Sequence, residues 1–234
     1  MQKIFTPIQL IFVAVWTAFS AITTFILIIF TMRQDMASLV GRKIWSPVIL
    51  FICRVKLVVE GAKNINLNKN YIFVSNHESH LDIPAIFYSV PLNLFFIAKK
   101  ELKKVPFMGW AMQAGGMIFI DRKNKEQAKK DMLKAGELIK NGKSIISFPE
   151  GTRTLTGEVG LFRRGSFLLS ISTGIEIVPV TISGARELLP SGSFFLKGGK
   201  VNIHIHPPVS PDKYSATTIE NFAEDVRNIV LSKK

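Results

Sequence analysis

The pattern of apolar and polar positions divides the chain into an apolar amino-terminal part and a longer part in which strand and helix signals alternate. Short runs of aromatic and β-branched residues, typical of buried strands, fall at residues 56–60, 71–75, 94–98, 117–120, 144–148, 177–182 and 200–206. Helical patterns fall at residues 83–90, 107–114, 124–141, 165–173 and 217–232. This alternation predicts an α/β domain over residues 56–234, with a mixed, largely parallel sheet covered by helices.

The clearest amphipathic helix is predicted at residues 124–141. Lysines cover one side of it, and Gly142 is expected to end it. The residues expected to face the core are Ala128, Met132, Leu133, Ala135, Leu138 and Ile139.

Residues 8–30 form an apolar stretch without a charged side chain. As a helix it would reach roughly 34 Å, enough to cross a hydrocarbon core of about 30 Å. Small polar residues mark one face of this helix, at spacings of three, four and seven: Thr17, Ser20, Thr24 and Thr31. Such a face is typical of close helix–helix packing in lipid.

A second helical segment is predicted at residues 36–54, and its uninterrupted apolar part, residues 44–53, is too short to span a membrane. Two arrangements of residues 1–55 therefore remain open. They form either a two-helix hairpin embedded in or lying on one leaflet, or a single spanning helix followed by a soluble domain. Basic residues downstream, such as Arg42 and Lys43, predict in both cases that the domain lies on the cytoplasmic face of the cell membrane.

The charge balance indicates an anionic partner. The chain carries 30 Lys and Arg against 17 Asp and Glu, a formal net charge of +13, which suits nucleic acid, an anionic membrane or a phosphorylated substrate. The aromatic residues lie mainly in apolar runs and not along a basic stripe, which argues against nucleic acid. The single cysteine excludes an intramolecular disulfide.

The most informative stretch is Asn76-His77-Glu78-Ser79-His80-Leu81-Asp82, between the predicted strand 71–75 and helix 83–90. A histidine accepts a proton near neutral pH, and a carboxylate on its other ring nitrogen fixes its tautomer. His77 and Asp82 can meet only if His77 lies in the loop and Asp82 opens the helix. Pro84 supports this arrangement, because proline is tolerated in a first helical turn.

Two other interpretations of this stretch remain open. Asp82 is also a good helix N-cap, and His77 and His80 are either polar loop residues or metal ligands together with Glu78. Metal is the least supported of these, because the other histidines lie on the predicted strand 200–206 and the lone cysteine lies far upstream.

Three further motifs follow or interrupt predicted strands. Arg122 follows strand 117–120 and presents either a phosphate-binding guanidinium or a salt bridge with Asp121. Residues 148–151 predict a β-turn, after which Arg153 lies between two threonines in a possible anion nest. Pro179, inside strand 177–182, predicts an edge strand or a bulge. Arg163 and Arg164 either add to the positive charge around these motifs or are solvated or face lipid headgroups.

Together these pieces resemble the glycerolipid acyltransferase family, specifically the bacterial 1-acylglycerol-3-phosphate acyltransferases. The family motif Asn-His-x-Ser-x-x-Asp is matched by Asn76, His77, Ser79 and Asp82. The motif Phe-Ile-Asp-Arg is matched at residues 119–122, Phe-Pro-Glu-Gly-Thr-Arg at 148–153, and Val-Pro-Val at 178–180. All four occur in the family's order.

The resemblance implies transfer of a fatty acyl group from acyl-CoA or acyl carrier protein to the sn-2 hydroxyl of lysophosphatidic acid, giving phosphatidic acid. It implies no metal, no cofactor and no covalent acyl-enzyme, and it names membrane lipid but not nucleic acid as a partner. The implied roles are His77 as general base, Asp82 as its orienting carboxylate, Arg122, Arg153 and Lys99 as phosphate ligands, and Asn76, Ser79, Glu150, Gly151 and Thr152 as supporting residues.

Two further roles are expected in the turn that contains Glu150 and Gly151. Glu150 is expected to orient an arginine or a glycerol hydroxyl, and main-chain N–H groups around Gly151 are candidates for the oxyanion donors.

Acylation of glycerol-3-phosphate or of another lysophospholipid is an alternative activity. A membrane protein that only binds anionic lipid is a more remote alternative.

Overall fold

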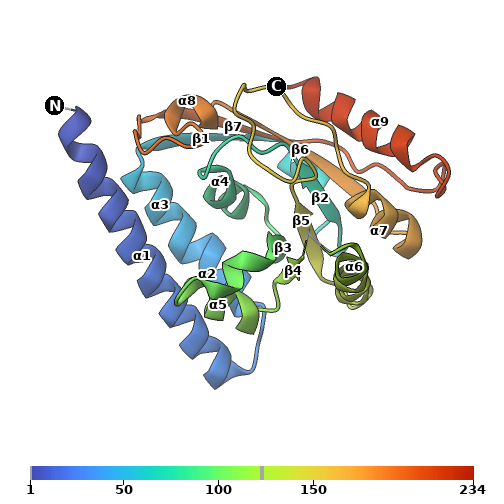
Figure 1. Ribbon diagram of the computed structural model, residues 1–234, viewed down its shortest axis with the longest axis horizontal. Coiled ribbons are helices and arrows are strands. Elements are labelled where there is room, and N and C mark those ends of the chain that lie inside the picture. Colours follow the sequence, from blue (N-terminus) through green and yellow to red (C-terminus); the bar gives the residue numbers. More distant parts are fainter. Residues whose placement is uncertain (1, 122–123) are drawn as a thin grey trace.

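A seven-stranded sheet between two layers of helices forms the centre of the molecule (Figure 1). The computed structural model describes residues 2–121 and 124–234, so Arg122, a predicted phosphate ligand, lies outside the described residues. The strands are β1 (Val55–Glu60), β2 (Ile72–Ser75), β3 (Leu94–Lys99), β4 (Ile118–Ile120), β5 (Ser144–Ser147), β6 (Ile177–Ser183) and β7 (Gly199–Ile205). They are ordered β1-β7-β6-β2-β5-β3-β4, and every neighbouring pair is parallel except β6 and β7. The predicted mixed, largely parallel sheet is confirmed.

The helices bury one apolar core on each face of this sheet. The α-helices are α1 (Gln2–Thr31), α2 (Met36–Val40), α3 (Ser46–Ile52), α4 (Asp82–Ser89), α5 (Met108–Ala114), α6 (Lys125–Lys140), α7 (Gly165–Thr173), α8 (Ala185–Leu188) and α9 (Ile219–Leu231). Shorter elements are the π-helical turn η1 (Gly41–Trp45) and the 3₁₀ turns η2 (Ala62–Asn64) and η3 (Lys100–Lys104). Side chains of α3, α4 and α8 pack on one face, and those of α6, α7 and α9 pack on the other.

The central strands β2 and β5 run side by side, and each is buried along its whole length. Their sequences are short apolar runs without alternation, as expected for parallel strands covered on both faces. Because the two strands are parallel, their carboxyl ends meet at one edge of the sheet. The loops that follow them, beginning at Asn76 and Phe148, therefore lie next to each other.

The prediction that Pro179 marks an edge strand is wrong, because β6 lies between β7 and β2. The alternative, a bulge, describes the pairing better. Val180 pairs with Ile205 and Ile177 with Val209, so an interval of three residues along β6 lies opposite an interval of four along residues 205–209. One extra residue lies at this point, and the missing proline N–H falls where the regular antiparallel pairing ends.

Helix α6 has the expected bounds, with Asn124 as its N-cap: its side chain accepts a hydrogen bond of 3.0 Å from the Gln127 N–H. Gly142, at φ +80°, follows its end as predicted. One prediction for this helix is wrong, because Leu133 is 64% exposed instead of packed in the core. It lies next to Met132, and the apolar face is narrower than the sequence pattern indicated.

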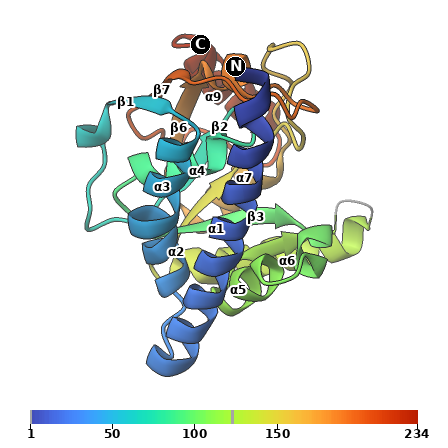
Figure 2. The same ribbon diagram turned by 90° about the vertical axis from the view of Figure 1, so that its left-hand side faces the viewer.

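The amino-terminal residues form a pair of packed helices, α1 and the continuous helix made of α2, η1 and α3 (Figure 2). The Trp45 indole N–H donates to the Thr17 hydroxyl at 3.0 Å, and the Gln9 side chain donates to the Ile52 carbonyl at 2.8 Å. Ser20 and Thr24 are buried, so the predicted packing face is confirmed at three of its four positions; Thr31 is exposed.

The opposite face of α1 carries a continuous row of exposed apolar side chains. They are Ile8, Ile11, Phe12, Val15, Phe19, Ile22, Ile26 and Ile29. Residues Thr6–Thr31 are long and apolar enough to cross a membrane. The inner face of the same helix packs along α3 and α5, so α1 is part of the folded unit.

Candidate active site

His77 and Asp82 are hydrogen-bonded at the carboxyl end of β2. The His77 Nδ1 atom lies 2.7 Å from the Asp82 Oδ2 atom. His77 is in the loop and Asp82 is the first residue of α4, which confirms the arrangement predicted from their spacing. Because an ionised carboxylate only accepts hydrogen bonds, Nδ1 carries the proton and Nε2 keeps its lone pair.

The Asp82 carboxylate is fully buried and holds the loop that precedes it. Its Oδ2 atom also accepts the main-chain N–H groups of Glu78 at 2.7 Å and Ser79 at 2.8 Å. The N-cap alternative is therefore wrong: the carboxylate binds the loop N–H groups before the helix and not those of its first turn. The other oxygen, Oδ1, is buried without a hydrogen-bond partner among the described residues.

The predicted β-turn after β5 lies beside His77. The Gly151 N–H donates to the Phe148 carbonyl at 3.0 Å, and Gly151 has φ +80°, a conformation that favours glycine. Because that N–H closes the turn, it is a poor candidate for an oxyanion donor. The Phe148 ring stacks on the His77 ring, with 4.1 Å between centroids.

Glu150, in the same turn, is bonded to two main-chain N–H groups, and no arginine among the described residues pairs with it. Its Oε1 atom accepts the His77 N–H at 2.7 Å, and its Oε2 atom accepts the Gly160 N–H at 2.9 Å. The Thr154 N–H donates to the His77 carbonyl at 2.9 Å. Burial raises the pKa of Glu150, and the hydrogen bonds from the Gly160 and His77 N–H groups lower it. The turn therefore fixes the main chain of His77 from both sides.

Asn76 and Ser79 attach the same loop to the rest of the domain. The Asn76 side chain donates to the Ile182 carbonyl at 2.9 Å and accepts the Ile182 N–H at 2.8 Å. The Ser79 hydroxyl donates to the Leu189 carbonyl at 2.8 Å. Both residues are buried, and their side-chain hydrogen bonds hold the loop.

The cations predicted to bind phosphate differ in how they are engaged. Arg153 precedes Thr154 and has a buried Nη1 atom without a hydrogen-bond partner among the described residues. Lys99 ends β3 and lies 3.4 Å from Glu101 in an exposed ion pair. Thr152 is exposed, and its hydroxyl donates to the Arg153 carbonyl.

Two further arginines are placed differently. The Arg163 guanidinium lies against Gly151, where an added Cβ would be 3.0 Å from it, so Arg163 belongs to the rim of the site. Arg164 forms an exposed ion pair with Glu220 of α9.

The metal alternative gains no support from the geometry. The described residues contain no group of three or more His, Cys, Asp and Glu side chains suited to a metal ion. Glu78, the proposed third ligand, points away from His77 and is paired with Lys234. That pair, and the stacking of Phe148 on His77, were not found from the sequence, since the partners are far apart along the chain.

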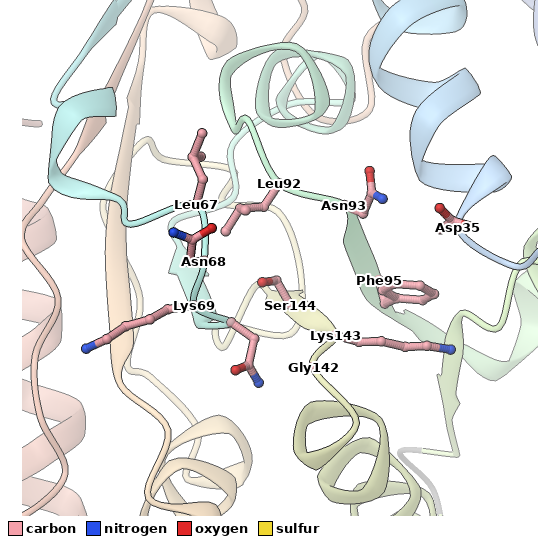
Figure 3. Close-up of a pocket in the computed structure, with 11 residues that line it drawn as sticks. Asp35, Leu67, Asn68, Lys69, Leu92, Asn93, Phe95, Gly142, Lys143 and Ser144 are labelled. Carbon is pink, nitrogen blue, oxygen red and sulfur yellow. The ribbon is translucent and has the colours of Figure 1, made fainter.

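A cavity of about 340 Å³ lies elsewhere, at the amino ends of the strands (Figure 3). Its lining includes Asn93, which precedes β3, and Lys143 and Ser144 at the start of β5. Because β2, β3 and β5 are parallel, this is the edge opposite the His77 loop. The cavity is separate from the constellation described above.

Comparison with known proteins agrees with this geometry. The acyltransferase family model matches residues 56–183, which include the His77 loop and the turn after β5. The chain belongs to the acyltransferase family.

Individual relatives support the assignment. This acyltransferase is 30% identical over 184 residues to the 1-acyl-sn-glycerol-3-phosphate acyltransferase of Borreliella burgdorferi, covering 79% of this chain and 74% of that protein. It is 34% identical over 200 residues to the enzyme of that name from Saccharomyces cerevisiae, covering 84% and 65%.

A solved structure is similar over almost the whole chain. The crystal structure of the 1-acyl-sn-glycerophosphate (LPA) acyltransferase PlsC from Thermotoga maritima has a TM-score of 0.83 and 32% identity, covering 98% of this chain and 95% of that one. The likeness therefore includes the amino-terminal helices as well as the sheet.

Proposed function

We propose that this acyltransferase transfers a fatty acyl group from a thioester, acyl-CoA or acyl carrier protein, to the sn-2 hydroxyl of lysophosphatidic acid and so makes phosphatidic acid. The observation that carries the proposal is the bond of 2.7 Å between His77 Nδ1 and the buried Asp82 carboxylate. It leaves Nε2 as a base whose ring is held in place. The names of the relatives support the choice of acceptor.

In the proposed reaction, His77 Nε2 removes the proton of the acceptor hydroxyl as its oxygen attacks the thioester carbonyl. The bond from carbonyl carbon to sulfur then breaks, and the imidazolium returns its proton to the leaving thiolate. General-base catalysis of this kind typically contributes about 10²–10⁴ in rate. A thiol has a pKa of about 8.5 and leaves readily, so the mechanism needs no metal and no acyl-enzyme.

The phosphate of the acceptor would bind Arg153, whose buried Nη1 atom has no protein partner in the described part of the chain. A guanidinium binds phosphate through two parallel hydrogen bonds. Arg163, against the Gly151 turn, and Lys99, at the end of β3, are further candidate ligands on the same edge of the sheet. Arg122 remains a candidate from its motif alone.

The exposed row on α1 would bind one leaflet of the cell membrane, with the domain on the cytoplasmic side. The inner face of α1 packs on α3 and α5. This packing favours a helix that stays on the domain and lies in one leaflet over a helix that separates from the domain and spans the bilayer. A site next to lipid is useful because lifting an acyl chain into water costs about 0.8 kcal/mol per CH₂.

The acceptor is tested by thiol release from purified, detergent-solubilised protein. Acyl-CoA and acyl carrier protein thioesters are each supplied with lysophosphatidic acid, glycerol-3-phosphate or a lysophospholipid with a larger headgroup. We expect release that depends on lysophosphatidic acid. Release with only one of the other acceptors would change the proposed substrate, and no release with any pair would contradict the proposed activity.

A further inference from the structure

Glu78 is a fully buried carboxylate, next to His77, whose partners come from two distant parts of the chain. Its Oε1 atom accepts the main-chain N–H groups of Ala185 at 2.9 Å and Arg186 at 3.2 Å, at the start of α8. Its Oε2 atom is paired with the ammonium group of Lys234, which follows α9. The Asn-His-x-Ser-x-x-Asp motif leaves the position of Glu78 unspecified.

The pair is one hydrogen bond away from the catalytic carboxylate. The Glu78 main-chain N–H donates to Asp82 Oδ2 at 2.7 Å, so the position of Glu78 affects the group that orients His77. The Lys234 ammonium also lies 3.3 Å from the Ile182 carbonyl, which accepts the Asn76 side chain as well. Lys234 therefore contacts both attachments of the loop.

The charges around Glu78 make its lysine partner necessary. The charged groups that face it are Lys234 and the Asp82 carboxylate, and Arg186 contributes a neutral main-chain N–H. Burial raises the pKa of Glu78, Lys234 lowers it, and Asp82 raises it. Removing one member of a buried ion pair leaves the other charge uncompensated, which is more damaging than replacing both members.

We propose that Lys234 is a positioning residue for the acyl transfer, acting through Glu78 on the loop that carries His77 and Asp82. This role rests on the proposed function. Without Lys234, a protonated Glu78 still accepts the two N–H groups of α8. An ionised Glu78 is then a buried anion beside Asp82. It either draws water into the loop or displaces the loop. The defect should therefore grow with pH.

The test measures kcat and KM across pH for Lys234→Met, Glu78→Gln, the double variant and a Lys233→Met control. Lys233 is the neighbouring lysine and makes no ion pair with a described residue. We expect Lys234→Met to lose about tenfold in kcat at pH 8, with KM within about twofold, and the loss relative to the wild type to become smaller as the pH falls. The double variant should recover most of that loss and show no extra pH dependence.

The outcomes separate this inference from the proposed function. If the wild type is active and Lys234→Met shows no pH-dependent loss, or if the double variant is no better, the positioning role is wrong. If Lys234→Met alone does not fold, the double variant should fold and be active, and its failure would also overturn the inference. A wild-type protein without acyl transfer would instead contradict the proposed function.

Discussion

Glu150 and His77 are 73 residues apart in sequence, and the Glu150 Oε1 atom accepts the His77 main-chain N–H at 2.7 Å. The same carboxylate accepts the Gly160 N–H through its other oxygen. A half-buried carboxylate thus connects the turn after β5 to the loop after β2. Glu150 therefore contributes to the site by fixing the main-chain position from which the His77 side chain extends.

Glu150→Gln should lower kcat. A glutamine oxygen can accept only one of the two N–H groups, and its amide NH₂ would face the other, leaving that N–H without its acceptor. We expect a loss of about tenfold or more in kcat with little change in KM. The control is Glu158→Gln, an exposed glutamate in the same loop. Equal activity of the two variants would contradict the role given to Glu150.

Arg153→Lys should weaken binding of the acceptor. The ammonium of lysine cannot make the two parallel hydrogen bonds of a guanidinium, so we expect KM for lysophosphatidic acid to rise by about tenfold or more at nearly constant kcat. Arg164→Lys is a matched control, since Arg164 is paired with Glu220 on α9. A kcat defect without a KM change would assign Arg153 a different task.

The buried His206 should make stability depend on pH. The Thr181 hydroxyl donates to the Val230 carbonyl at 2.7 Å, so it accepts from His206 Nε2 at 2.9 Å. Burial lowers the pKa of His206 from 6.5 to about 4. Below pH 6.5 the unfolded chain binds a proton that the folded chain does not. Stability should therefore be full above pH 6.5 and fall as the pH drops toward 4.

The unfolding temperature in detergent, measured near pH 7.5 and near pH 5, checks this. His206→Gln should show a smaller drop between the two values than the wild type. His204→Gln removes a ring 4.5 Å from that of His206, which also lowers the pKa of His206, so its drop should lie between those of His206→Gln and the wild type. An equal drop in all three proteins would mean that other groups control the acid sensitivity.

Acidic residues on the exposed face of α1 should weaken membrane binding. Val15 and Phe19 are 63% and 57% exposed, and replacing both by Asp places two charges where the proposal puts lipid. We expect cosedimentation with anionic vesicles to fall by an order of magnitude or more. Leu133→Asp on α6 is the control, because Leu133 is equally exposed on the far face of the sheet. Unchanged binding of the α1 variant would place the membrane surface elsewhere.

The strands and the meeting of His77 with Asp82 could be predicted because both follow from local sequence. Buried parallel strands are short apolar runs, which can be recognised in the sequence. Asp82 lies five positions after His77 and Pro84 lies in the first helical turn, so the two side chains can meet only with His77 in the loop and Asp82 at the helix start. The partner of Glu150 could not be predicted, because it depends on two parallel strands placing their loops together. Pro179 shows the same limit: a one-residue shift in pairing lets it occupy an interior strand.

The central claim is that His77 is the base of an acyl transfer to lysophosphatidic acid, and one measurement tests it most directly. Thiol release from an acyl thioester in the presence of lysophosphatidic acid is followed for the wild type, His77→Ala and His204→Ala. The wild type and His204→Ala should release thiol at equal rates, and His77→Ala should lose about 10²–10⁴ of that rate. A His77→Ala protein that releases thiol as fast as the wild type would contradict the account.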